Sequence, residues 1–107
     1  MSSGSFVKPL NFADRAHQPL LEPPASRCLH AGFVTLQPGA EVGVHSTKHY
    51  EEMLVILSGS GEGRIAGREP LKLTALQIAY ISPHTEHNVV NTGAEVLRYV
   101  YVVTEVE

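Results

Sequence analysis

Histidine and glutamate side chains suited to metal binding fall into two short segments of this 107-residue chain. The first segment contains His45, His49 and Glu52, and the second contains His84 and His87. Imidazole and carboxylate groups are ligands for divalent Fe, Mn, Ni, Cu and Zn, and neither segment contains a cysteine that would narrow this choice. Because the two segments are far apart in sequence, they form one site only if the fold brings them together.

The stretch that begins at Glu52 predicts a strand. Side chains alternate along a strand, so Glu52 shares one face with Leu54 and Ile56, whereas Glu51 shares the other face with Met53. One glutamate therefore points inward and the other outward. Each residue taken alone also fits an ordinary role, since glutamates at a strand start are commonly surface charges and a lone strand histidine is commonly a core residue.

The elements that would position these residues are short strands. From Leu29 onward no helical apolar period is sustained, and turn residues recur at intervals of about 8 to 12 residues. The main predicted strands span residues 30–36, 52–57, 77–81, 86–90 and 95–103, and another runs to about residue 45. This pattern predicts an all-β sandwich or a small closed barrel.

A single domain accounts for residues 1–107, because a chain of this length with 43% hydrophobic residues can bury one modest core. Residues 1–27 are rich in Ser and Pro and predict an extended arm, while residues 28–107 predict the barrel. The one cysteine, Cys28, has no partner for an intramolecular disulfide. Its apolar surroundings predict a buried or half-buried structural thiol.

The charge distribution argues against two classes of partner. Lys and Arg total 8 against 11 Asp and Glu, and the cations are scattered, so we expect no nucleic-acid partner. No apolar run approaches about 20 residues, and the first residues lack the basic head and apolar stretch of a secretory signal. We therefore expect no membrane association and a cytoplasmic location. Arg64 and Arg98 are the only candidate cations in the predicted barrel strands, which disfavours a phosphosugar ligand.

The last predicted strand places two tyrosines on one face, where Tyr99 and Tyr101 follow Leu97 at intervals of two residues. Core packing is the simplest role for both rings, and a phenol that reaches toward a metal is the alternative. His17 and His30 lie outside both segments, and the sequence predicts that they are solvated or strand-surface residues.

The first histidine segment resembles the first characteristic segment of the cupin superfamily. That segment reads Gly, five residues, His-x-His, three or four residues, Glu, six residues and Gly. Gly39, His45, Glu52 and Gly59 occupy these slots, with the four-residue spacer. Because the spacing to the last glycine selects Glu52 as the inward ligand, Glu51 is expected outside or at the rim.

The second histidine segment resembles the second cupin segment, which reads Gly, five residues, Pro-x-Gly, two residues, His, three residues and Asn. His87 and Asn91 match this pattern. Leu76 and His84 stand in the two glycine slots, and Ser82 stands in the proline slot. The resemblance covers about half of the chain, residues 39–91. His84 would lie at the mouth of the pocket or contribute a further contact to the metal or the substrate.

This resemblance implies a cupin double-stranded β-helix, also called a jelly-roll barrel, with one divalent metal ion held by His45, Glu52 and His87. Thr47 stands where the family has its second histidine. His49 is therefore a candidate fourth ligand or a residue of the pocket rim, and Thr47 would be a pocket hydroxyl. Two histidines and one carboxylate already form a sufficient ligand set for a metal with open positions.

The resemblance also implies a small-molecule ligand and a homodimer formed by packing sheets and exchanging an N-terminal strand. The leading hypothesis is a metal-binding cupin that acts on a small, mostly apolar or carbonyl-bearing molecule, as a mononuclear metal-dependent dioxygenase or a related enzyme. A non-catalytic small-molecule sensor or binding domain and a metal-dependent isomerase are the alternatives. The fold and the ligand set do not choose among these functions.

Overall fold

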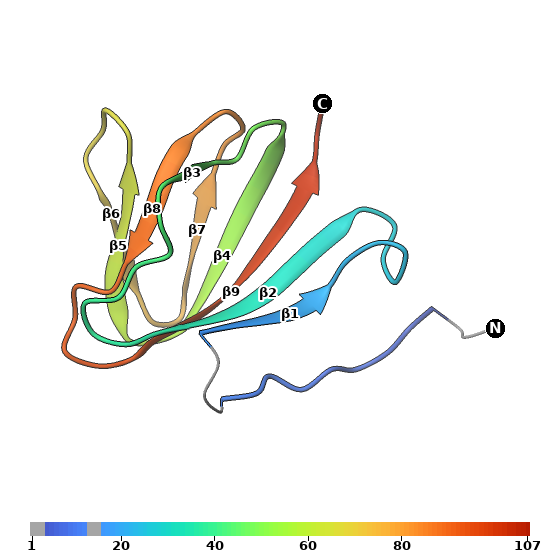
Figure 1. The fold of residues 1–107 in the computed structure, drawn as a ribbon, viewed down its shortest axis with the longest axis horizontal. Coiled ribbons are helices and arrows are strands. Elements are labelled where there is room, and N and C mark those ends of the chain that lie inside the picture. Colours follow the sequence, from blue (N-terminus) through green and yellow to red (C-terminus); the bar gives the residue numbers. More distant parts are fainter. Residues whose placement is uncertain (1–3, 13–15) are drawn as a thin grey trace.

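The computed structural model describes residues 4–12 and 16–107 of the chain. The regular structure in these residues consists of nine strands in two antiparallel sheets, which face each other as in a jelly-roll barrel (Figure 1). The larger sheet has the order β1 (His17–Leu21), β2 (Leu29–Leu36), β9 (Leu97–Glu105), β4 (Tyr50–Ser58) and β7 (Gln77–Ile81). The smaller sheet has the order β3 (His45–Ser46), β8 (Glu86–Val90), β5 (Ser60–Ile65) and β6 (Leu71–Thr74).

The expected all-β fold is therefore confirmed. Within the described ranges, no helix is long and apolar enough to cross a membrane. Most of the predicted strands are present within one or two residues of their expected ends. The predicted strand that leads to residue 45 is the main exception, because its only pairings are a bridge between Glu41 and Val90 and the two-residue strand β3.

The alternation predicted for β4 is confirmed by its burial. Leu54 and Ile56 are each 1% exposed and belong to the core between the sheets, whereas Met53 is 37% exposed on the outer face. In β9, Leu97 and Tyr99 face the same core. The inner faces of the two sheets thus form one continuous apolar core, and Glu52 follows Tyr50 on the inner face of β4.

The predicted arm contributes a strand to the barrel. Its residues 17–21 form β1, which pairs with β2 of the same chain at the edge of the larger sheet. Upstream of the strand, Phe12 stacks on Phe33 with ring centroids 5.2 Å apart. Residues 1–3 and 13–15 of the arm lie outside the described residues. Cys28 is exposed, so the expectation of a buried thiol was wrong, because the turn between β1 and β2 carries it outside the core.

Turn geometry explains several positions of the two motifs. Gly59 has a φ of 83°, and a Cβ at this position would collide with the backbone carbonyl of Val96, so only glycine fits. Asn91 is 1% exposed and its amide donates to the carbonyls of Leu36 and Glu95. These two residues therefore stabilise the loops at one end of the barrel.

Candidate metal centre

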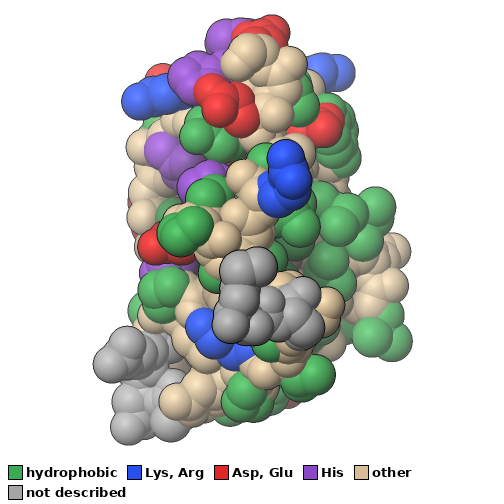
Figure 2. Space-filling model, turned by 90° about the vertical axis from the view of Figure 1, so that its right-hand side faces the viewer, with side chains coloured by type: hydrophobic (Ala, Val, Ile, Leu, Met, Phe, Trp, Pro, Cys, Tyr) green, Lys and Arg blue, Asp and Glu red, His purple; other side chains and the backbone are tan. Residues whose placement is uncertain are grey.

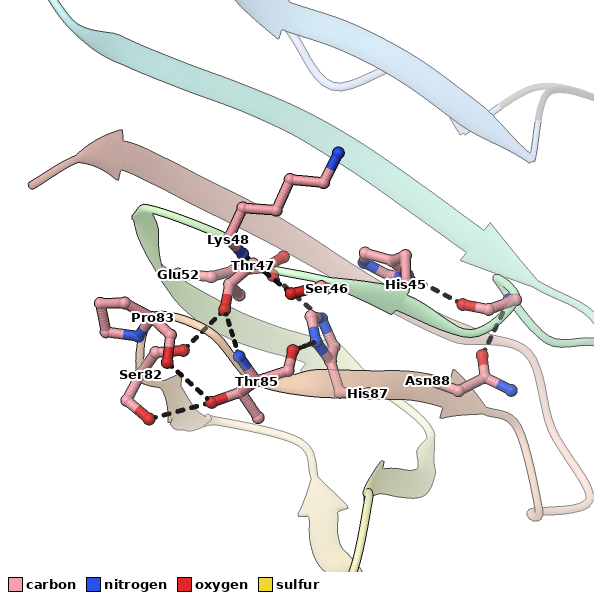
Figure 3. A network of polar contacts seen from close by, with 11 residues as sticks. His45, Ser46, Thr47, Lys48, Glu52, Ser82, Pro83, Thr85, His87 and Asn88 are labelled. Carbon is pink, nitrogen blue, oxygen red and sulfur yellow. Dashed lines mark hydrogen bonds and ion pairs between the residues drawn. The ribbon is translucent and has the colours of Figure 1, made fainter. Parts of the chain in front are cut away.

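Three of the predicted ligands lie together in the structure, where His87 is buried, Glu52 is partly buried and His45 is exposed. His45 on β3 and His87 on β8 are paired directly across the smaller sheet, and their ring centroids are 4.2 Å apart. Glu52 approaches from β4 of the larger sheet, and its Oε1 lies 3.2 Å from Nε2 of His87. The potential ligand atoms of the three residues all lie within 4.8 Å of one another. The close-up shows the three side chains converging from the three strands (Figure 3).

Main-chain carbonyls orient both histidine rings. Nδ1 of His45 lies 2.8 Å from the carbonyl oxygen of Gly43, and Nδ1 of His87 lies 3.0 Å from that of Thr85. A carbonyl only accepts, so each Nδ1 must carry the proton and donate it. In each neutral ring Nε2 then has a free lone pair, which is the arrangement that a histidine ligand of a metal requires.

The donor set fits a divalent metal ion. Metal–nitrogen and metal–oxygen bonds of about 2.0–2.2 Å place neighbouring ligands roughly 3 Å apart, close to the distance between His87 and Glu52. The side chains of these two residues are only 1% and 11% exposed. A carboxylate at this depth requires a cation or a hydrogen-bond donor, since burial of an unpaired charge is costly. Three protein ligands leave open positions for water or a substrate.

The ion pair between His87 and Glu52 is expected to make metal binding depend on pH. Burial opposes the charged form of His87, but the hydrogen bonds to Glu52 and to Thr85 and the charge of Glu52 outweigh it. The net result is that the pKa of His87 lies above its usual value of 6.5. In the metal-free protein a proton on His87 therefore competes with the metal for the same nitrogen.

We predict that the affinity for Zn²⁺ falls as the pH is lowered through this raised pKa. The fall is expected to approach tenfold per pH unit while His87 alone competes, and binding should release protons. Calorimetric titrations in buffers of different ionisation enthalpy measure both quantities. An affinity that stays constant from pH 8 to pH 6 would contradict the involvement of this histidine.

A cavity of about 620 Å³ lies beside the three ligands. Its walls are mostly apolar, with Val34, Leu36, Val42, Val89 and Val103 among the lining residues. Among the described residues, no Lys or Arg lines it. Histidine side chains lie along one edge of the molecular face seen in Figure 2, with acidic side chains between them. The cavity is therefore suited to a small, largely apolar molecule, for which a metal would be the main positive charge.

The other candidates of the two motifs lie outside this group. His49 is half exposed, and its Nε2 is paired with a carboxylate oxygen of Glu105 at 3.1 Å. His84 is exposed, and its Nε2 lies 2.7 Å from Oε1 of Glu107. Thr47 is buried and lines the cavity, as expected, and its hydroxyl donates to the carbonyl of Ser82 and accepts from the amide of Thr85. Thr47 therefore ties loops together where the family motif has a second histidine.

Two histidines line the cavity although sequence reasoning did not assign them to it. His17 and His30 both line the cavity, although their positions outside the motifs carried no signal. Tyr99 and Tyr101 line it as well, and Tyr99 also belongs to the core, so both roles considered for this face are combined. Only the register of β1, β2 and β9 brings these side chains together.

Comparison with solved structures supports the fold. A Cupin 2 conserved barrel domain protein from Salinispora arenicola superposes with a TM-score of 0.79 at 23% identity, covering 94% of this chain and 89% of that one. A cupin protein from Bacteroides fragilis gives a TM-score of 0.77 at 26% identity, covering 92% and 83%. A predicted oxalate decarboxylase from Thermotoga maritima gives a TM-score of 0.77 at 24% identity, covering 84% and 79%.

Comparison of the sequence with curated proteins found no match. The family profile described as Cupin domain matches residues 32–103, which span the strands from β2 into β9 and include all three potential ligands. This match takes in more than half of the chain, and it agrees with the two motifs and with the jelly-roll fold. The protein therefore belongs to the cupin family.

Proposed function

We propose that this protein is a cytoplasmic cupin that binds one divalent metal ion and uses it to act on a small, mostly apolar molecule. The observation that carries the proposal is the convergence of His45, Glu52 and His87 at the wall of an apolar cavity. The two histidines and the carboxylate would hold the ion, and the cavity would hold the molecule beside it.

A dioxygenase or a related mononuclear metal enzyme is the reaction class that we favour. A bound metal of this ligand class supplies Lewis acidity and, where it is redox-active, a site for dioxygen. A sugar-phosphate isomerase is disfavoured, because the two candidate arginines are engaged elsewhere. Arg64 is exposed and pairs with Glu62, and the guanidinium of Arg98 lies over the ring of Phe12.

Metal analysis followed by oxygen uptake tests this proposal. The purified protein is expected to bind one divalent ion per chain and, when loaded with Fe(II), to consume dioxygen in the presence of small apolar carboxylates and carbonyl compounds. His87→Ala should abolish both signals, whereas Tyr80→Phe should keep both, because Tyr80 lies on the outer face where it donates to Glu51. Binding of metal and ligand without oxygen uptake would favour a non-catalytic sensor or binding domain.

We also propose that the protein forms a homodimer through the outer face of the larger sheet. Met53 on β4 is paired with Val102 on β9 and Tyr80 on β7, and Ile78 on β7 is 64% exposed. These residues are uncharged, and the neighbouring carboxylate of Glu51 accepts a hydrogen bond from Tyr80, so the face can pack against a copy of itself with little like-charge repulsion. We predict a dimer at micromolar concentration by sedimentation and a monomer for Ile78→Glu. A wild-type monomer would refute this assembly.

A further inference from the structure

Tyr101 reaches across the larger sheet on its inner face. It is paired with Gly32 of β2, and a Cβ at this glycine would lie 2.5 Å from the tyrosine ring. The absent side chain therefore leaves the space in which the ring lies. Beyond β2, the phenol oxygen lies 2.7 Å from Nε2 of His17 on the edge strand β1, and the two rings stack with an angle of 15°. Three strands thus combine to hold this phenol in one position.

The phenol of Tyr101 and the proposed metal ligands line the same cavity. Tyr101 pairs with Leu54, and the next inward residue of β4 is Glu52, so the two are diagonal neighbours on one face. Burial, with the charges of Glu52 and Glu22, raises the pKa of Tyr101. The phenol is therefore neutral and protonated at neutral pH.

The bond to His17 leaves part of the hydrogen-bonding capacity of the phenol free. A tyrosine hydroxyl has one donor and two acceptor positions, and either tautomer of His17 occupies only one of them. With the ring nitrogen accepting, the phenol oxygen can still accept from a ligand; with the nitrogen donating, its hydroxyl can donate. The pair therefore suits an uncharged ligand group such as a hydroxyl or a carbonyl.

The net charge of the site limits the charge of the ligand group that lies at the metal. A divalent ion with one carboxylate and two neutral histidines carries one net positive charge, and no lysine or arginine among the described lining residues adds to it. The other carboxylate of the lining, Glu41, is exposed and accepts a hydrogen bond from Asn88, so solvent screens its charge. In a mostly apolar cavity an uncompensated second negative charge would be costly. The site thus favours a ligand with one anionic oxygen group at the metal.

We propose that Tyr101 is a specificity-determining residue, and that the ligand is an apolar monoanion with a neutral hydroxyl or carbonyl at its far end. The anionic group would lie at the metal, the body against the valines of the cavity, and the neutral oxygen at the phenol of Tyr101. His17 and Gly32 are positioning residues, because they hold the phenol without being required to contact the ligand. This inference rests on the proposed metal-dependent function and names its class of substrate.

Paired probes that differ by one hydroxyl test this assignment. The linear alkanoates from butanoate to nonanoate and their ω-hydroxy counterparts are titrated calorimetrically into the Zn²⁺-loaded protein. The series varies the distance between the carboxylate and the terminal hydroxyl, so that one member can reach from the metal to the phenol of Tyr101. For the chain length that reaches Tyr101, the hydroxy acid is expected to bind about three- to tenfold more tightly than the plain acid, which is the net value of one hydrogen bond. This ratio of the two affinities is the quantity compared among the variants. Tyr101→Phe should abolish this ratio while leaving the binding of Zn²⁺ and of the plain alkanoate unchanged.

Tyr80→Phe is the matched control, because it removes a phenol outside the cavity and should keep the wild-type ratio. Gly32→Ala keeps the phenol but displaces its ring, and it should lose the ratio as Tyr101→Phe does. A hydroxyl preference that is absent at every length, or that survives Tyr101→Phe, would overturn the assignment while the metal proposal stands. Failure of the alkanoates to bind the Zn²⁺-loaded protein would overturn the ligand class, and failure to bind Zn²⁺ would overturn the proposed function itself.

Discussion

Replacing His87 with alanine is expected to reduce the affinity for Zn²⁺ at least about 100-fold. Structural zinc sites with four ligands bind with roughly 10–16 kcal/mol, so each ligand contributes about 3 kcal/mol, and this corresponds to a factor of about 100. The loss should not be recovered by the other two residues, because His45 and Glu52 alone do not enclose an ion. Direct titration of the metal-free protein, with unfolding curves to verify that the variant folds, measures the effect.

His49→Ala is the control for this experiment. Its imidazole lies outside the group of three and is paired with Glu105, so its removal should change the affinity for Zn²⁺ by less than about threefold. A loss as large as that of His87→Ala would show that the loop folds back and that His49 is a full ligand. The comparison therefore decides between a three-ligand and a four-ligand centre.

Substitution of the two adjacent glutamates by glutamine is expected to give opposite results. Glu52→Gln removes the only carboxylate of the group and should weaken Zn²⁺ binding at least about 100-fold. Glu51→Gln should leave binding nearly unchanged, because the carboxylate of Glu51 accepts a hydrogen bond from Tyr80 on the outer face. Loss at Glu51 with retention at Glu52 would mean that the register of β4 is shifted by one residue.

The metal-free form of Glu52→Gln offers an independent check through its stability. The pKa of His87 is raised in the folded protein, so its pairing with Glu52 stabilises the fold below the unfolded value of 6.5. That contribution is lost as the pH rises through the folded pKa. Urea unfolding should therefore show a larger difference between wild type and Glu52→Gln at pH 5.5 than at pH 8. An equal difference at both values would indicate that the pair contributes nothing.

Local patterns in the sequence were sufficient for the fold class and for the three residues of the proposed centre. The alternation along β4 identified Glu52 as the inward glutamate, and motif spacing linked it to His45 and His87. The pair formed by His17 and Tyr101 could not be predicted in this way. The two residues are 84 positions apart in sequence, and their contact depends on the register of three strands. No local pattern encodes such a register.

Two departures from the family motif also have a structural explanation. Leu76 and His84 occupy glycine slots, and their φ angles are 66° and 56°, so the left-handed turns are kept although the glycines are absent. Such a conformation costs a residue with a side chain about 1–2 kcal/mol. Main-chain hydrogen bonds of the turns offset part of this cost, since Leu76 donates its amide to the carbonyl of Ile56 and His84 donates to that of Lys48.

The carbonyl groups that orient His45 and His87 belong to the main chain, at Gly43 and Thr85. Every amino acid has a main-chain carbonyl, so a substitution that keeps the backbone in place also keeps both hydrogen-bond acceptors for the imidazoles. The valines of the cavity wall do not orient either imidazole. Exchange of Val34 or Val42 for larger or smaller residues would reshape the cavity while both imidazoles keep their orientation. The residues that shape the cavity are therefore different from the groups that orient the imidazoles, and a directed library confined to the wall should alter ligand preference while the expected affinity for Zn²⁺ is kept.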